Sequence, residues 1–195
     1  GSFWEPFPEE ISRNISSGFS DLLLAVSDLT ESNLRKERKT RKKEIIKIGN
    51  TIIDSSLISL NKNKKLKEKL PKEFALINIH RHENIKNKKR LQMIVKSIKE
   101  VTIPAIWPLH DNTRYYLEKY GFMDEVKKMK NIKITPLISY FGFISLLSKC
   151  KYLFVDGGSI QEESLVFKKP CILLRKVTER QEGLETGINF LTEMD

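Results

Sequence analysis

The sequence contains little cysteine and no long hydrophobic run. Its two cysteines, Cys150 and Cys171, are too few for a disulfide framework and lack the spacing of metal ligands. No apolar stretch approaches the roughly 20 residues that span a bilayer, and the N-terminus lacks the basic-then-apolar pattern of a secretory signal. We therefore expect a cytoplasmic protein with no membrane partner and no metal site.

Arginine is also scarce, although the chain is basic. Of 35 basic residues only nine are arginine, and against 25 acidic residues they give a net charge of +10. Nucleic-acid surfaces concentrate their charge and use arginine to contact bases and phosphates, whereas the lysines here are scattered along the chain. We expect no nucleic-acid partner. The content of 39% hydrophobic and 31% charged residues indicates a globular fold.

Short apolar runs alternate with segments of helical spacing over most of the chain. Continuous apolar runs are typical of strands covered on both faces, and they occur at residues 22–26, 45–48, 74–79, 103–107, 132–134, 152–155 and 171–174. Helical spacing occurs at residues 83–100, 111–120, 140–149 and 160–167. Strand–helix–strand repetition predicts an α/β fold with a Rossmann-like, doubly wound parallel sheet.

Both ends of the sequence look cut. Phe3, Trp4 and Phe7 form an aromatic cluster among prolines with no preceding element to pack on, and residues 187–195 stop inside an expected helix. The basic stretches 35–44 and 61–72 contain almost no apolar residues. A solvated connector or helix face explains them better than a docking surface does.

The most informative segment is Asp156-Gly157-Gly158-Ser159, between an expected strand and an expected helix. Ligands bind at the carboxyl ends of strands in such sheets, and two glycines before a helix N-terminus allow close approach of a phosphate. Ser159 and Glu162 also fit a capping box, which would make the segment a turn without a ligand. The pattern alone leaves these two interpretations open.

Polar side chains follow other expected strands in the same way. His80 and Arg81 follow one strand and His110 follows the next, so a shared crevice is expected. A capped helix start with an incidental histidine is the alternative for His80. For Arg180, after the last strand, the alternative is a surface loop, and for Glu9 it is the acidic first turn of a helix.

Seven motifs in this order resemble the non-hydrolysing UDP-N-acetylglucosamine 2-epimerase family. They are PFPEEISR (6–13), GNTIID (49–54), HRHEN (80–84), PLHDNTR (108–114), DGGSIQEE (156–163), KPCILLR (169–175) and TERQEG (178–183). The resemblance implies the GT-B architecture of two facing Rossmann-like domains. Residues 1–50 would be a remnant of the N-terminal domain, and residues 51–195 an incomplete C-terminal, UDP-binding domain.

The resemblance also implies a chemistry without a cofactor. The family eliminates UDP across C1 and C2 of the sugar and adds it back after C2 is protonated on the opposite face. By motif match, Glu9 is a catalytic carboxylate and His80 is the acid or phosphate-assisting histidine. Gly157, Gly158 and Ser159 would hold the diphosphate with their N–H groups.

Further residues match binding positions of the family. Glu163 would take the ribose hydroxyls, Arg180 would face the diphosphate, and Phe143 would pack near uracil. Arg81 and His110 match positions around a second, regulatory UDP-N-acetylglucosamine.

Two positions depart from the family pattern. The usual Ser-Gly-Gly loop is permuted here to Gly157-Gly158-Ser159, and a residue expected to hydrogen-bond uracil is Leu137. Selectivity for the base is therefore less secure than binding of the diphosphate.

The sequence is therefore interpreted as the C-terminal portion of an isomerase. It would interconvert UDP-N-acetylglucosamine and UDP-N-acetylmannosamine for surface polysaccharide synthesis, as a homodimer in full-length form. The alternatives are a hydrolysing relative that releases free sugar and UDP, and a nucleotide-sugar-binding module without turnover. A cut at residue 50 also predicts that strands 22–26 and 45–48 lack sheet partners and expose apolar surface.

Overall fold

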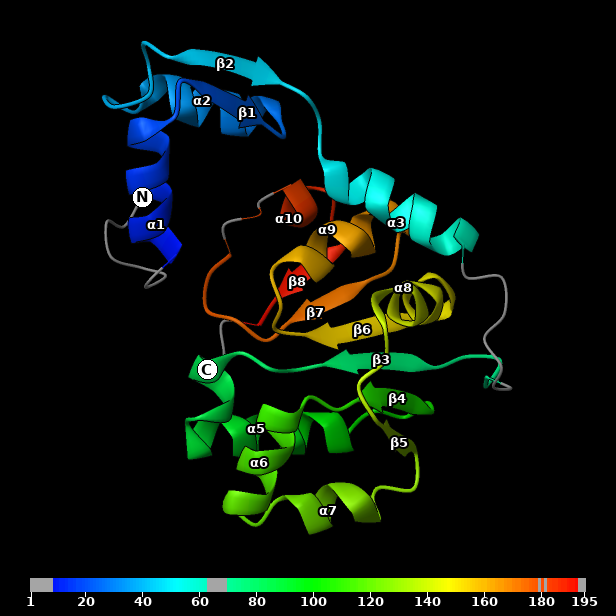
Figure 1. Cartoon of the computed structure of the whole chain (residues 1–195). Helices are drawn as coiled ribbons and strands as arrows, with labels where there is room; N and C mark the ends of the chain where they lie inside the picture. The colour runs from blue at the N-terminus through cyan, green and yellow to red at the C-terminus, as the bar shows by residue number, and fades with distance from the viewer. Residues whose placement is uncertain (1–8, 63–69, 179, 181, 193–195) are drawn as a thin grey trace. The chain divides into compact units, whose positions relative to one another are not determined.

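The computed structural model describes residues 9–62, 70–178, 180 and 182–192, and the chain divides into two compact units (Figure 1). The units are Gly1–Thr51 and Ile52–Asp195. Each unit has its own parallel sheet, of two strands in the first and six in the second. The predicted aromatic cluster at Phe3, Trp4 and Phe7 lies outside the described residues.

The smaller unit is a β–α–β arrangement preceded by a helix. Its elements are α1 (Glu9–Phe19), β1 (Leu22–Ala25), α2 (Asp28–Lys36) and β2 (Glu44–Lys47). Helix α2 begins at Asp28 because the Ser27 side chain accepts a hydrogen bond from the Thr30 N–H. The unit matches the sequence prediction of two strands in this region.

One face of this two-stranded sheet is apolar and exposed. Leu23, Ala25 and Ile45 are buried on one face, whereas Leu24 and Ile46 on the other are 53% and 43% exposed. Sheets of parallel strands are normally covered on both faces. β1 and β2 pair with each other, and the apolar surface expected on these strands is exposed on this face.

We expect the isolated 195-residue chain to associate reversibly, because covering this exposed apolar sheet face lowers the free energy of the system. Sedimentation velocity should show a weight-average mass that rises with concentration. The double variant Leu24→Lys/Ile46→Lys should shift the distribution toward monomer, whereas Lys42→Glu, an exposed change outside both strands, should not. A monomer at all concentrations would contradict the prediction.

The larger unit is a doubly wound α/β sheet, which confirms the predicted fold class. Its strands are β3 (Ala75–Asn78), β4 (Ala105–Pro108), β5 (Ile132–Thr135), β6 (Tyr152–Val155), β7 (Cys171–Leu173) and β8 (Asn189–Leu191). All neighbours pair parallel, in the order β5-β4-β3-β6-β7-β8. The chain thus starts in the middle, winds to one edge and then returns to build the other half.

Helices cover the two faces of this sheet. They are α3 (Thr51–Lys62), α4 (His82–Ile85), α5 (Lys88–Lys99), α6 (Asp111–Lys119), α7 (Met123–Lys128), α8 (Tyr140–Lys149), α9 (Ser159–Val166) and α10 (Glu182–Glu185). In Figure 1, α5, α6 and α7 lie on one side of the sheet, and α8 and α9 lie on the other. Side chains of β3 alternate accordingly: Ile77 joins the core with α5, and Leu76 joins the core with α8.

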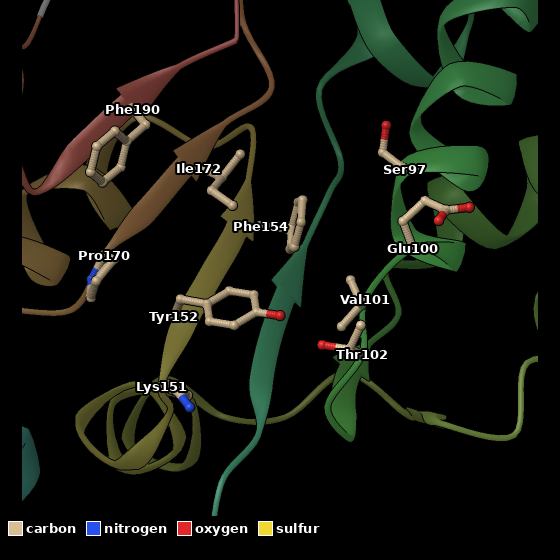
Figure 2. A pocket seen from close by; sticks show the side chains of 10 residues that line it. All are labelled: Ser97, Glu100, Val101, Thr102, Lys151, Tyr152, Phe154, Pro170, Ile172 and Phe190. Atoms are coloured by element: carbon tan, nitrogen blue, oxygen red, sulfur yellow. The ribbon is translucent and has the colours of Figure 1, made fainter.

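A part of one face of the six-stranded sheet is open. Figure 2 shows the side chains of Tyr152, Phe154, Ile172 and Phe190 on β6, β7 and β8, beside the end of α5. They line a hollow of about 620 Å³, and Phe190 is 52% exposed. The hollow lies on the face opposite to the side chains of Leu153 and Leu173, which pack in the core with α8.

Two local predictions were wrong. The segment predicted as one helix, 83–100, consists of α4 and α5, because the Asn87 side chain accepts hydrogen bonds from two N–H groups and starts a new helix. Residues 189–191, expected within a helix, form β8 at the edge of the sheet.

In the part of the chain that the structure describes, no helix is long and apolar enough to cross a membrane.

Candidate functional site

The strand order reverses between β3 and β6, and this places a crevice at the carboxyl ends of both strands. Asn78 at the end of β3 lies opposite Val155 at the end of β6. The segment 80–84 follows β3, and the segment 156–159 follows β6. In open α/β sheets this reversal point is where ligands bind.

Asp156 joins the two segments. Its side chain is fully buried, and its carboxylate accepts hydrogen bonds from the backbone N–H groups of His80 and Arg81, each at 3.0 Å to the nearest oxygen. It also accepts one from the Asn84 side chain at 3.1 Å, and Asn84 donates a second bond to the Leu174 carbonyl at 2.9 Å. These bonds fix the backbone at His80 relative to the glycine loop.

Two histidines stack beside this network. The rings of His80 and His110 have centroids 4.6 Å apart and planes inclined by 26°. The Asn78 side chain bridges them, with its Oδ1 3.0 Å from His80 Nδ1 and its Nδ2 3.4 Å from His110 Nε2. Burial and then the neighbouring His80 lower the pKa of His110, so that its neutral form is favoured.

The N-terminus of α9 faces the same crevice, with Gly158 and Ser159 in the lining of the pocket described below. Gly158 is the N-cap residue, and as a glycine it makes no side-chain capping bond, so the helix is uncapped in this sense. Ser159 is the first helical residue, so the capping-box interpretation of Ser159 and Glu162 is wrong. A Cβ atom at Gly157 would lie 3.2 Å from Cε1 of His80, so a glycine allows the histidine to pack directly on this loop.

Glu163 brings a buried carboxyl group to the site from the second turn of α9. The residue is only 4% exposed, and burial raises its pKa, while a hydrogen bond with Tyr140 acts in the opposite direction. Tyr140 begins α8, and Phe143 lies one turn further along the same helix and is 9% exposed. A group that needs an acceptor, such as a sugar hydroxyl, would find one in the ionised Glu163.

A pocket of about 290 Å³ brings most of the predicted residues together. Its lining includes the predicted residues His80, His110, Phe143, Gly157, Gly158, Ser159 and Glu163. The sequence analysis gave no role to other lining residues, namely Asn78, Pro108, Ile138, Tyr140 and Ile160. A polar Asn at the end of an otherwise apolar strand was a signal that could have identified Asn78.

Three predicted residues are not among those that line this pocket. Arg81 pairs with Glu83 at 2.9 Å, and Arg180 pairs with Glu162 in the first turn of α9 at 2.8 Å. Glu9 is the first residue of α1 in the smaller unit, and its side chain lies outside the described part of the chain. Within residues 9–62, 70–178, 180 and 182–192, no three His, Cys, Asp or Glu side chains are grouped to hold a metal ion.

Comparison with known proteins gives consistent matches over the whole chain. The family model described as UDP-N-acetylglucosamine 2-epimerase matches residues 2–195. The UDP-N-acetylglucosamine 2-epimerase of Methanocaldococcus jannaschii is 34% identical over 97% of this chain and 55% of its own length. A UDP-2,3-diacetamido-2,3-dideoxy-D-glucuronate 2-epimerase of Pseudomonas aeruginosa is 31% identical over 97% of this chain and 53% of its own.

Solved structures agree with these matches. The M. jannaschii enzyme in complex with UDP-GlcNAc and UDP superposes with a TM-score of 0.88 at 33% identity, covering 100% of this chain and 56% of that one. The chain thus spans about half the length of the curated relatives that it matches.

Proposed function

Because the chain belongs to the UDP-N-acetylglucosamine 2-epimerase family, we propose that the full-length protein interconverts UDP-N-acetylglucosamine and UDP-N-acetylmannosamine. The present chain supplies the part that binds UDP. One observation carries this proposal: a single pocket joins the uncapped N-terminus of α9, the side chain of His80 and the buried carboxyl group of Glu163.

Each part of the pocket suits one part of UDP. The N–H groups of Gly157, Gly158 and Ser159 would bind the diphosphate, because a helix N-terminus offers free donors and a positive dipole end. Glu163 would accept hydrogen bonds from the ribose hydroxyls, and Phe143 would pack against uracil.

Arg180 would contribute charge to the same anion. Its ion pair with Glu162 holds the guanidinium group at the first turn of α9. A guanidinium group can donate two parallel hydrogen bonds to a phosphate, which adds geometric specificity to the attraction.

The chemistry requires a proton to leave C2 and the bond between C1 and the UDP oxygen to break. The products are enzyme-bound 2-acetamidoglucal and UDP; UDP then adds back to C1 while C2 gains a proton on the opposite face. His80 would assist departure of the phosphate, and Glu9 would act as a carboxylate in proton transfer at C2. Free sugar in place of UDP-N-acetylmannosamine would instead identify a hydrolysing enzyme.

Other features of the full-length protein follow from the same proposal. Arg81 and His110 would contact a regulatory UDP-N-acetylglucosamine, and the protein would act as a cytoplasmic homodimer in surface polysaccharide synthesis. The match to the P. aeruginosa enzyme makes a related UDP-sugar the alternative substrate.

The first test is calorimetric titration of this chain with UDP. We expect binding, and we expect Arg180→Ala to weaken it about tenfold or more, since a hydrogen bond to a charged group contributes about 1.5–3 kcal/mol. Arg90→Ala is a matched control, because it removes the same charge from a residue that lies on α5 and does not line the pocket.

Equal weakening by Arg180→Ala and Arg90→Ala would indicate a general charge effect and contradict the placement of the diphosphate. If the chain does not bind UDP, the titration is repeated on the full-length protein. Absence of binding there as well would refute the proposed function.

We also expect UDP affinity to depend on the protonation of Glu163. Burial raises the pKa of Glu163, and the ionised carboxylate accepts hydroxyl hydrogens on both oxygens, whereas protonation turns one oxygen into a donor. Affinity should therefore fall as pH falls through this raised pKa. The β-phosphate of UDP also titrates near pH 6, so the measurement is the difference between wild type and Glu163→Gln across about pH 5–8. Identical pH dependence in the two proteins would contradict this role of Glu163.

A further inference from the structure

We propose that Asn78 is a positioning residue that sets the tautomers of both stacked histidines, and so makes Nε2 the proton-exchanging nitrogen of His80. The inference rests on the proposed function for its catalytic meaning. Its structural part depends only on the contacts among Asn78, His80, His110 and Asp156.

The first step concerns His80. Its Nδ1 lies 3.0 Å from the Asn78 Oδ1 and 3.5 Å from the Asp156 Oδ1. Both partners are oxygen acceptors, so His80 Nδ1 carries a hydrogen and donates it. In the neutral ring the other nitrogen, Nε2, then has a free lone pair.

The second step fixes the orientation of the Asn78 amide. If the amide were flipped, its NH₂ group would face His80 Nδ1. A hydrogen on Nδ1 would then meet a second donor beside Asn78, which is only 9% exposed, and a lone pair on Nδ1 would instead lie 3.5 Å from the buried Asp156 carboxylate oxygen. The position of the Asp156 carboxylate therefore selects the orientation in which Oδ1 faces His80.

The third step passes this choice to His110. With Oδ1 facing His80, the Asn78 NH₂ group lies 3.4 Å from Nε2 of His110. That nitrogen must accept the bond, so His110 carries its hydrogen on Nδ1. Both rings thus carry their hydrogen on Nδ1, but Nε2 has a free lone pair in His80 and accepts a hydrogen bond in His110. Burial and the neighbouring His80 lower the pKa of His110 and so favour the neutral ring, in which one nitrogen can accept.

The consequence for the reaction is that His80 can exchange a proton only through Nε2. A histidine with an undefined tautomer would present the correct nitrogen for only part of the time. Asn78 removes that ambiguity and also holds the ring against His110, although it touches no reacting atom itself.

The test uses the ring nitrogens of the histidines, of which the sequence contains only three, at positions 80, 82 and 110. Long-range ¹H–¹⁵N spectra of ¹⁵N-labelled protein, recorded at about pH 8, distinguish protonated from unprotonated ring nitrogens. Single His→Gln variants assign the signals. In the wild type we expect a hydrogen on Nδ1 of both His80 and His110.

Two variants separate the tautomer effect from a packing effect. Asn78→Asp keeps the shape but offers only oxygens, so His110 should switch its hydrogen to Nε2 while His80 keeps Nδ1–H. Asn78→Leu removes both bonds, so His110 should show a mixture of tautomers. The exposed His82 serves as the internal control and should not change in either variant. Unchanged tautomers of His110 in Asn78→Asp would overturn the inference.

The catalytic meaning is tested in the full-length protein. Asn78→Leu should lower kcat at least about tenfold with UDP affinity nearly unchanged, and its pH profile should shift because His80 no longer has one defined donor. The failures are distinguishable. A wild-type protein without epimerase activity would refute the proposed function and leave the tautomer result standing, whereas unchanged tautomers in an active enzyme would refute only the role of Asn78.

Discussion

His80→Ala in the full-length protein should reduce epimerisation by about 10²–10⁴-fold while it leaves UDP affinity within about threefold. His80 is the histidine of the pocket that borders the glycine loop: a Cβ atom at Gly157 would lie 3.2 Å from its Cε1, and Asp156 accepts a hydrogen bond from its backbone N–H. Under the proposed function, departure of UDP would place negative charge on the phosphate, and loss of this side chain would remove the pocket group proposed to neutralise it by proton transfer. Under the proposed function, binding of UDP itself would depend mainly on the N–H groups of α9 and on Glu163.

Two measurements check this result. Formation of UDP-N-acetylmannosamine, followed by proton NMR in D₂O, also reports exchange at C2, and calorimetry reports UDP affinity. His82→Ala is the matched control, since His82 is exposed on α4 and does not line the pocket. Near-normal turnover in His80→Ala would refute the assignment of His80, and a parallel loss in His82→Ala would point to damage to the whole segment.

Asp156→Ala should lower the free energy of unfolding by about 3–5 kcal/mol. The carboxylate is fully buried and accepts bonds from the N–H groups of His80 and Arg81 and from the Asn84 amide. Alanine leaves these three donors without an acceptor in a place that water does not reach. A loss of this size is a large part of the stability of a typical domain, which is about 5–15 kcal/mol.

A graded series tests the cause. Asp156→Asn retains one oxygen acceptor and should cost less than Asp156→Ala, and Asp111→Ala, which removes an exposed carboxylate from the first turn of α6, should cost about 1 kcal/mol or less. Urea unfolding followed by circular dichroism at low protein concentration gives the three values. Equal losses for Asp156→Ala and Asp111→Ala would contradict the role of Asp156 as the acceptor that joins the two segments.

The sequence predicted the central strands and the edge strand β5, and it missed the other edge strand, β8. Runs such as residues 74–77 and 152–155 are apolar because strands in the middle of a parallel sheet have apolar neighbours on both faces; β3 is buried at every residue and β6 at alternate residues. β8 contains only Asn189, Phe190 and Leu191 and lies at the edge, where burial does not require a continuous apolar run. The break between α4 and α5 was missed because the flanking residues keep a helical spacing and only the side chain of Asn87 reveals the cap.

The parts of the site that depend on neighbouring residues were also predicted from the sequence. The glycine pair before α9 and the histidine after β3 can be identified there, because the backbone requirements of a phosphate loop act over a few residues. Glu163 was placed on the correct helix for the same reason.

The tertiary structure alone decided how these parts meet. Asn78, His110 and Asp156 are separated by 32 residues or more along the chain, and they come together because β4 and β6 flank β3 in the sheet. A buried carboxylate can be shared among donors from several segments only after the strand order has brought those segments side by side. The sequence by itself therefore determined which residue types stand at the strand ends, and the sheet topology decided which of them share hydrogen bonds. Hydrogen bonds act over about 3 Å, and sequence spacing does not specify positions to that precision across separate strands.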